Sequence, residues 1–183
     1  MAQPPTLWTG RLILRPFVPA DAPRVTELVS PYEIADTTAT IPHPYVEPMA
    51  DDWISGQTAA FEAGENVTFA MTLAPDGELV GAMGLRLQPY LRAAELGYWV
   101  GMPYWNRGYA TEAARAIIAH AFGALDLERV HANHLLRNPA SGRVMEKAGM
   151  RREGILRRSA IKWDRLEYLV FWSILREEWP GER

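Results

Sequence analysis

The sequence contains no cysteine among its 183 residues. A chain without cysteine has no disulfide framework, no thiolate nucleophile and no cysteine-ligated metal site. Long apolar runs are also missing, since no segment approaches the ~20 apolar residues that a bilayer-spanning helix needs. The first residues show neither a basic start nor an apolar stretch, so we expect no secretory signal and a cytoplasmic protein without a membrane partner.

Neither sign of charge is in large excess: the chain has 19 Lys and Arg and 22 Asp and Glu, which gives a net charge of −3. This balance gives no indication of a nucleic-acid partner. Hydrophobic residues make up 48% of the chain and charged residues 22%, as in ordinary globular proteins. At this length we expect one domain, residues 1–183, built around one core.

Hydrophobic periodicity predicts a mixed sheet with helices on its faces, hence an α/β (α+β) fold. Expected strands are 11–15, 67–73, 78–87, 95–101, 129–136, 151–159 and 167–174. Expected helices are 19–29, with Asp21 as N-cap, then 47–63, 110–125 and 139–148. The helix at 110–125 has the clearest apolar stripe, and its early positions are mostly alanine, which lets it lie close to a sheet.

The most informative segment, 98–113, runs from a strand through a glycine-containing turn into the long helix. The first turn of such a helix has unpaired N–H groups and a positive dipole end, which suit an anionic oxygen. Gly108 leaves the approach open, and Arg107 adds positive charge. The spacing matches neither a P-loop nor a dinucleotide fingerprint. By itself the turn is equally consistent with Gly108 serving only a tight strand-to-helix connection.

Several blocks, taken in order, resemble the GNAT superfamily of acyl-CoA-dependent N-acetyltransferases, and within it the RimJ/RimL-type ribosomal-protein N-terminal acetyltransferases. The blocks are 9–16, 42–45, 95–100, 105–113, 138–150 and 152–157, so the resemblance covers nearly the whole chain. One departure is Trp105, which stands where the superfamily motif begins with Arg or Gln, although this branch often carries Trp there. Another is Asn106, which stands where glycine is frequent.

The resemblance implies a twisted, largely antiparallel sheet flanked by helices, in which the fourth and fifth strands splay apart at a bulge. Pantetheine of acetyl-CoA would lie in that opening, and the N–H groups of 107–111 would hold its pyrophosphate. The implied cofactor contacts are Trp99, Val100, Asn106, Arg107, Gly108, Tyr109, Ala110, Thr111, Asn138 and Ser141.

Acetyl transfer to an amine needs a proton acceptor for the amine and a proton for the departing thiolate. Glu95 is our candidate base, because the base of the histone-acetylating branch stands at a matching offset before the turn. We expect a carboxylate in a partly apolar cleft to have a raised pKa. Alternatively, Glu95 pairs with Arg86 or Arg92. The glutamate that ribosomal-alanine relatives keep on the fifth strand is matched here by Asn133, which cannot act as a base.

Ser141 is the candidate proton donor to the thiolate by its matching position. A serine there also serves the first turn of the helix, and Asn138 equally suits an N-cap. The N–H groups of Trp99 and Val100 are expected to polarise the thioester carbonyl.

The histidines are not expected to bind metal, because His131 and His134 fall on opposite faces of a strand. We expect His120 on the surface and His43 beside the acceptor pocket. Four aromatic residues are further candidates for the wall of that pocket: Tyr32, Tyr45, Trp53 and Tyr90.

The sequence thus predicts an N-acetyltransferase that moves an acetyl group from acetyl-CoA to a primary amine by direct attack in a ternary complex. The acceptor is a protein N-terminus or a small-molecule amine. A non-catalytic acyl-CoA-binding regulatory module is the alternative. A homodimer, formed through the C-terminal strands or the helical region, remains open.

Overall fold

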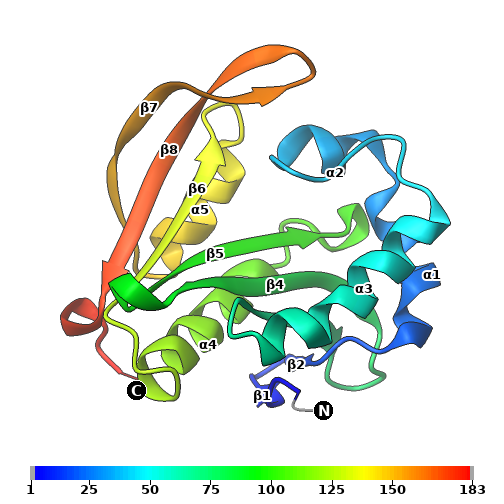
Figure 1. Ribbon diagram of the computed structural model, residues 1–183, viewed down its shortest axis with the longest axis horizontal. Helices are drawn as coiled ribbons and strands as arrows, with labels where there is room; N and C mark the ends of the chain where they lie inside the picture. Colours follow the sequence, from blue (N-terminus) through cyan, green and yellow to red (C-terminus); the bar gives the residue numbers. More distant parts are fainter. Residues whose placement is uncertain (1–2, 182–183) are drawn as a thin grey trace.

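A computed structural model describes residues 3–181 and contains one eight-stranded sheet with the order β1-β2-β3-β4-β5-β6-β8-β7 (Figure 1). The strands are β1 (Leu7–Trp8), β2 (Leu12–Arg15), β3 (Asn66–Leu73), β4 (Leu79–Gln88), β5 (Ala93–Val100), β6 (Arg129–Leu135), β7 (Arg151–Lys162) and β8 (Arg165–Leu175). Neighbouring strands are antiparallel except β5 and β6, which are parallel. This mixed sheet confirms the predicted fold class.

Helices cover both faces of the sheet. They are α1 (Ala22–Val29), α2 (Tyr32–Thr37), α3 (Glu47–Glu62), α4 (Tyr109–Gly123) and α5 (Pro139–Lys147), with short 3-10 turns at η1 (Pro19–Asp21), η2 (Pro89–Leu91), η3 (Met102–Tyr104) and η4 (Arg176–Glu178). α4 packs on β2, β4, β5 and β6, and α5 packs on β6 and β7. α3 packs on β3 from the opposite face, together with α1 (Figure 1). No helix formed by residues 3–181 combines the length and the apolar character needed to cross a membrane.

The sheet opens between β5 and β6. These two strands pair only from Ala93 with Arg129 to Glu95 with His131, and beyond that point they diverge (Figure 1). This confirms the predicted splay between the strands at 95–101 and 129–136. β5 nevertheless keeps an unbroken register with β4 from Ala93 to Val100, so the expected bulge is not present in that ladder. The opening therefore forms because pairing with β6 stops.

The long helix is confirmed: its predicted stripe is buried against the sheet. Other predictions need correction. Asp21 occupies the N-cap position of α1 without capping it, because its carboxylate pairs with Arg15 at 2.7 and 2.8 Å and accepts the Val18 N–H. The short helix α2 and the two-residue strand β1 were not predicted, since neither is long enough to show a periodicity.

Gly81 on β4 lets β5 approach closely beside the opening. A methyl group at Gly81 would overlap the carbonyl oxygen of Trp99 and lie 3.1 Å from the Cα of Val100. Both neighbours are backbone atoms, so they cannot turn aside as a side chain could. Gly97 on β5 is different, because a methyl group there would meet no atom within 4 Å.

We predict that Gly81→Ala destabilises the protein by roughly 1–3 kcal/mol, as overpacking does, because β5 must shift. Gly97→Ala is the matched control and should change stability by no more than about 0.5 kcal/mol. Urea unfolding followed by circular dichroism measures both. Equal effects of the two substitutions would contradict the proposed clash.

On the other side of the opening, Glu153 of β7 joins three strands. Arg129 of β6 donates to both of its carboxylate oxygens at 2.7 Å, and the hydroxyl of Ser173 on β8 donates at 2.7 Å. The hydrogen bonds from Arg129 and then Ser173 lower the pKa of Glu153 from 4.5 to about 2. These bonds fix β6 to the C-terminal hairpin.

A carboxylate with a lowered folded-state pKa stabilises the protein above its unfolded pKa, and this contribution is lost as the pH falls through the folded value. Glu153→Gln should therefore be less stable than the wild type at pH 7, and the difference should close between pH 4.5 and about 2. Because the side chain is 42% exposed, screening limits the difference to about 1 kcal/mol. Urea midpoints measured against pH test this, and a gap that stays constant down to the lowest pH would refute it.

Candidate active site

The divergence of β5 and β6 leaves backbone groups of β5 facing an opening. The N–H of Gly101 bonds the carbonyl of Val80 on β4 at 2.9 Å. The N–H groups of successive residues in a strand point to opposite sides. The N–H of Trp99 therefore also points to β4, whereas that of Val100 points into the opening. Of the two N–H groups predicted to polarise the thioester carbonyl, that of Val100 thus faces the opening and that of Trp99 faces β4.

Trp105 lies beside this opening, at the position of the superfamily's Arg or Gln. Its indole N–H donates to the carbonyl of Val100 at 2.6 Å. This bond satisfies a backbone acceptor that β6 would have taken in a continuous sheet. Trp105, which departs from the superfamily motif, therefore has a structural role at the end of β5.

The turn between β5 and α4 has the geometry expected of an anion site. Asn106 and Gly108 both have positive φ, 60° and 84°, and Gly108 is the N-cap of α4. Glycine takes this conformation without strain. No side chain of residues 3–181 caps the helix, so the first N–H groups of α4 remain available as hydrogen-bond donors.

Two arginines lie at this turn. Arg11 pairs with Glu112 at 2.7 Å, donates to the carbonyl of Arg107 at 3.0 Å and lies over the ring of Tyr109. Arg107 itself is exposed. Burial raises the pKa of Glu112, but hydrogen bonds from Thr9 and Arg11 outweigh burial and lower it overall. Sequence reasoning missed the Arg11–Glu112 pair, which joins the start of β2 to the start of α4.

Ser141 and Asn138 lie at the start of α5, across the opening from β5. The side chain of Asn138 accepts the N–H of Ser141 at 3.3 Å and donates to the carbonyl of Thr37 at 3.1 Å. The N-cap role is therefore confirmed, and both polar atoms of the amide have protein partners. The hydroxyl of Ser141 lies 2.6 Å from the phenol oxygen of Tyr98, a β5 residue that sequence reasoning did not select.

Glu95 lies at the apex of the opening, in the last residue pair between β5 and β6. It pairs with Arg86 of β4, and Asn133 of β6 donates to its other oxygen at 2.7 Å. Of the two predicted pairing partners, Arg86 is the one found, because Arg92 instead pairs with Asp126 and Glu128. The two positions where relatives carry glutamates thus meet, and the carboxylate lies among polar groups rather than in the expected partly apolar cleft.

Within residues 3–181, no three or more His, Cys, Asp or Glu side chains group in a way that could hold a metal ion. His120 is not on the surface as predicted. It is half-buried against Phe69, with ring centroids 6.1 Å apart, because α4 presses this side of the helix onto the sheet. Burial lowers its pKa.

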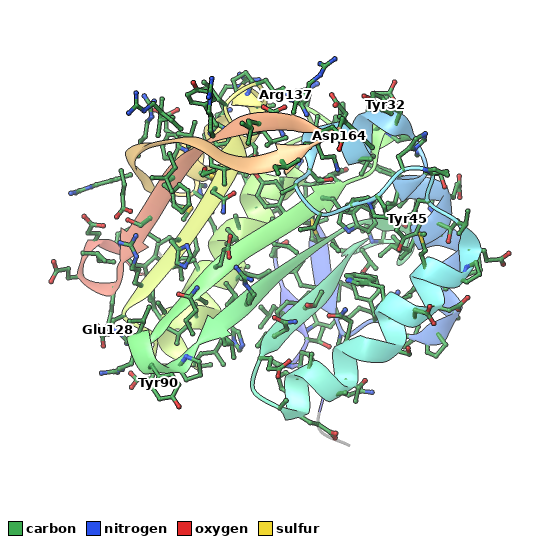
Figure 2. All side chains as sticks on the ribbon, turned by 45° about the horizontal axis from the view of Figure 1, so that its top comes forward. Tyr32, Tyr45, Tyr90, Glu128, Arg137 and Asp164 are labelled. Carbon is green, nitrogen blue, oxygen red and sulfur yellow. The ribbon has the colours of Figure 1, made fainter. Side chains whose placement is uncertain are left out.

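An open cavity of about 290 Å³ lies between α2 and the β7–β8 hairpin. It is lined by Tyr32, Asp36, Arg137, Trp163, Arg165 and Glu167. Tyr32 stacks on Trp163 and meets the ring of His43 edge-on, with ring centroids 5.4 Å apart in both pairs, so His43 lies near this cavity. Tyr90 is not part of this wall, because it is fully exposed at η2, far from Tyr32 (Figure 2). Trp53 instead packs against Phe17.

A family model described as an acetyltransferase (GNAT) domain matches residues 11–151. YdaF of Bacillus subtilis, named for a proposed ribosomal N-acetyltransferase activity, is 30% identical over 183 aligned residues, which cover 94% of this chain and 95% of YdaF.

Solved structures match the fold of this chain over nearly its full length. RimJ of Mycobacterium smegmatis, solved in complex with CoA-disulfide, has a TM-score of 0.89 and 26% identity and covers 98% of this chain and 91% of its own. A GNAT-family acetyltransferase from Bacillus anthracis has a TM-score of 0.85 and 27% identity and covers 94% of this chain and 99% of its own.

Proposed function

Since the chain belongs to the acetyltransferase (GNAT) family, we propose that it transfers an acetyl group from acetyl-CoA to a primary amine by direct attack in a ternary complex. The observation that carries this proposal is the opening between β5 and β6, which leads to the uncapped start of α4 at Gly108. A molecule with an extended arm joined to a pyrophosphate suits this combination, and acetyl-CoA has such an arm in its pantetheine.

In this proposal the N–H groups of 107–111 hold the pyrophosphate, with charge from Arg107, and pantetheine lies along the inner edge of β5. The N–H of Val100 faces that path and can bond pantetheine or the thioester carbonyl. Trp99 lines the path through its position in β5, and Asn138 through its position at the start of α5. RimJ of Mycobacterium smegmatis, a structural relative of this chain, was solved in complex with CoA-disulfide, which supports a CoA derivative as the ligand.

The chemistry divides between the two faces of the sheet. The amine nitrogen attacks the thioester carbon, the C–S bond breaks, and the CoA thiolate leaves. Glu95 takes the proton that the amine loses, directly or through water. Ser141 lies near the sulfur and contacts the leaving thiolate.

The acceptor is a primary amine, on a protein N-terminus or a small molecule, and we propose that the enzyme acts in the cytoplasm. Because YdaF is named for a ribosomal N-acetyltransferase activity, a free protein N-terminus is the acceptor that we propose first. The cavity beside Tyr32 and Trp163 offers an aromatic surface for the residues that follow such an amine.

We predict that Gly108→Asp abolishes measurable acetyl-CoA binding, because its carboxylate would repel the pyrophosphate at the start of α4. Gly108→Asn has a similar size and the same tolerance of positive φ but no charge, so it should bind with an affinity reduced by about tenfold. Isothermal titration calorimetry on the two variants and the wild type measures this, with thermal melts as a check of folding. Failure of the wild type to bind would refute the proposed function.

Glu95→Gln should lower kcat by about 10²–10⁴ while acetyl-CoA affinity stays unchanged, as expected for loss of a general base. Thiol release is followed with an amine panel consisting of a peptide with a free N-terminus, a polyamine and an aminoglycoside. If Arg86→Gln lost as much activity, the ion pair rather than the base would be responsible. Acetyl-CoA binding without turnover on the panel would favour the non-catalytic module.

A further inference from the structure

Tyr98 and Ser141 form a hydrogen-bonded pair across the opening. Tyr98 belongs to β5, and Ser141 lies in the first turn of α5, the helix that follows β6. The phenol oxygen lies 2.6 Å from the hydroxyl of Ser141 and 3.2 Å from its carbonyl oxygen. Under the proposed function, the sulfur of acetyl-CoA lies in the same opening, beside this pair.

Each of the two hydroxyl groups has one proton, and this limits what the pair can do. If the Tyr98 proton goes to the carbonyl of Ser141, the serine proton goes to Tyr98. If the Tyr98 proton goes to the serine hydroxyl, the serine proton is free to reach a sulfur. The N–H of Ser141 takes no part, because it bonds Asn138.

Neither hydroxyl is suited to give its proton away. Burial raises the pKa of Tyr98 to about 12, and the hydrogen bond with Ser141 only partly opposes this. A thiol ionises near a pKa of about 8.5, so the leaving thiolate is too weak a base to deprotonate either group. What the pair can supply is a directed hydrogen bond, which favours the charged thiolate.

We propose that Tyr98 is a positioning residue that donates to Ser141 and directs the serine proton at the CoA sulfur, so that the thiolate leaves as a hydrogen-bonded anion. The C–S electron pair stays on sulfur, and no proton is transferred from Ser141. This inference rests on the proposed function, because it requires the thioester to lie in the β5–β6 opening.

Titratable side chains occur on each of the elements around this bond. His134 of β6 packs its ring against Gly142, next to Ser141, and burial lowers the pKa of His134. Its Nδ1 lies 2.8 Å from the carbonyl of Leu135. Arg143 on α5 is exposed, and Glu95 on β5 points to the opposite face of the sheet.

The absence of cysteine makes a direct test available, since the CoA thiol is the one thiol in a complex with this chain. Calorimetry first gives the CoA affinity of the wild type, Tyr98→Phe, Ser141→Ala and the double variant. The rate at which iodoacetamide alkylates CoA, held by an excess of protein, is then measured against pH. Tyr90→Phe serves as the matched control, because that ring is fully exposed.

We expect the apparent pKa of bound CoA thiol to rise by about one unit in Tyr98→Phe and in Ser141→Ala relative to the wild type, and not in Tyr90→Phe. The double variant should shift no further than the larger single effect, because the two groups act as one unit. In turnover, kcat of both single variants should fall about tenfold, in line with one pKa unit, with the KM for acetyl-CoA little changed.

A shift in Ser141→Ala without a shift in Tyr98→Phe would overturn the role of Tyr98 and leave the proposed function standing. A Tyr98→Phe variant that loses CoA affinity and thermal stability, but keeps the wild-type thiol pKa, would show a merely structural contact. If the wild type bound no CoA, the proposed function and this inference would fall together.

Discussion

The rest of the structure depends on the length of one strand pairing. β5 and β6 share three residue pairs, and all other pairings that flank them are longer. Had the parallel pairing continued, the N–H and carbonyl of Val100 would form hydrogen bonds with β6. Because it stops at Glu95 and His131, those groups need other partners. Trp105 takes the carbonyl, and under the proposed function the N–H bonds the cofactor.

An opening of this kind has to be held by the elements around it. On one side, Glu112 takes hydrogen bonds from Thr9 and Arg11 and fixes the start of α4 to β2. On the other, Glu153 fixes β6 to β7 and β8 through Arg129 and Ser173. The two helix starts beside the opening also differ, because α5 is capped by Asn138 and α4 is uncapped. The free dipole end therefore belongs to α4.

Features of the site that depend on neighbouring residues could be predicted from the sequence. The apolar stripe of α4, the glycine at its start and the cap at Asn138 each depend on residues close to one another in the sequence. Contacts between distant positions could not be predicted. The Arg11–Glu112 pair spans 101 residues, and the meeting of Glu95 with Asn133 depends on the β5–β6 register. The partial burial of His120 was also missed, because periodicity shows which positions face the sheet but not how far the stripe extends around the helix.

The same opening explains how base and thiolate can be kept apart. Glu95 and Tyr98 are three positions apart on β5, so their side chains leave opposite faces of the sheet. Under the proposed mechanism, the amine comes from the face of Glu95 and the sulfur departs on the face of Ser141. A thioester that reacts with both must pass through the plane of the sheet. A continuous β5–β6 ladder would block that passage, so the short pairing is a requirement of this division of roles as well as its structural origin.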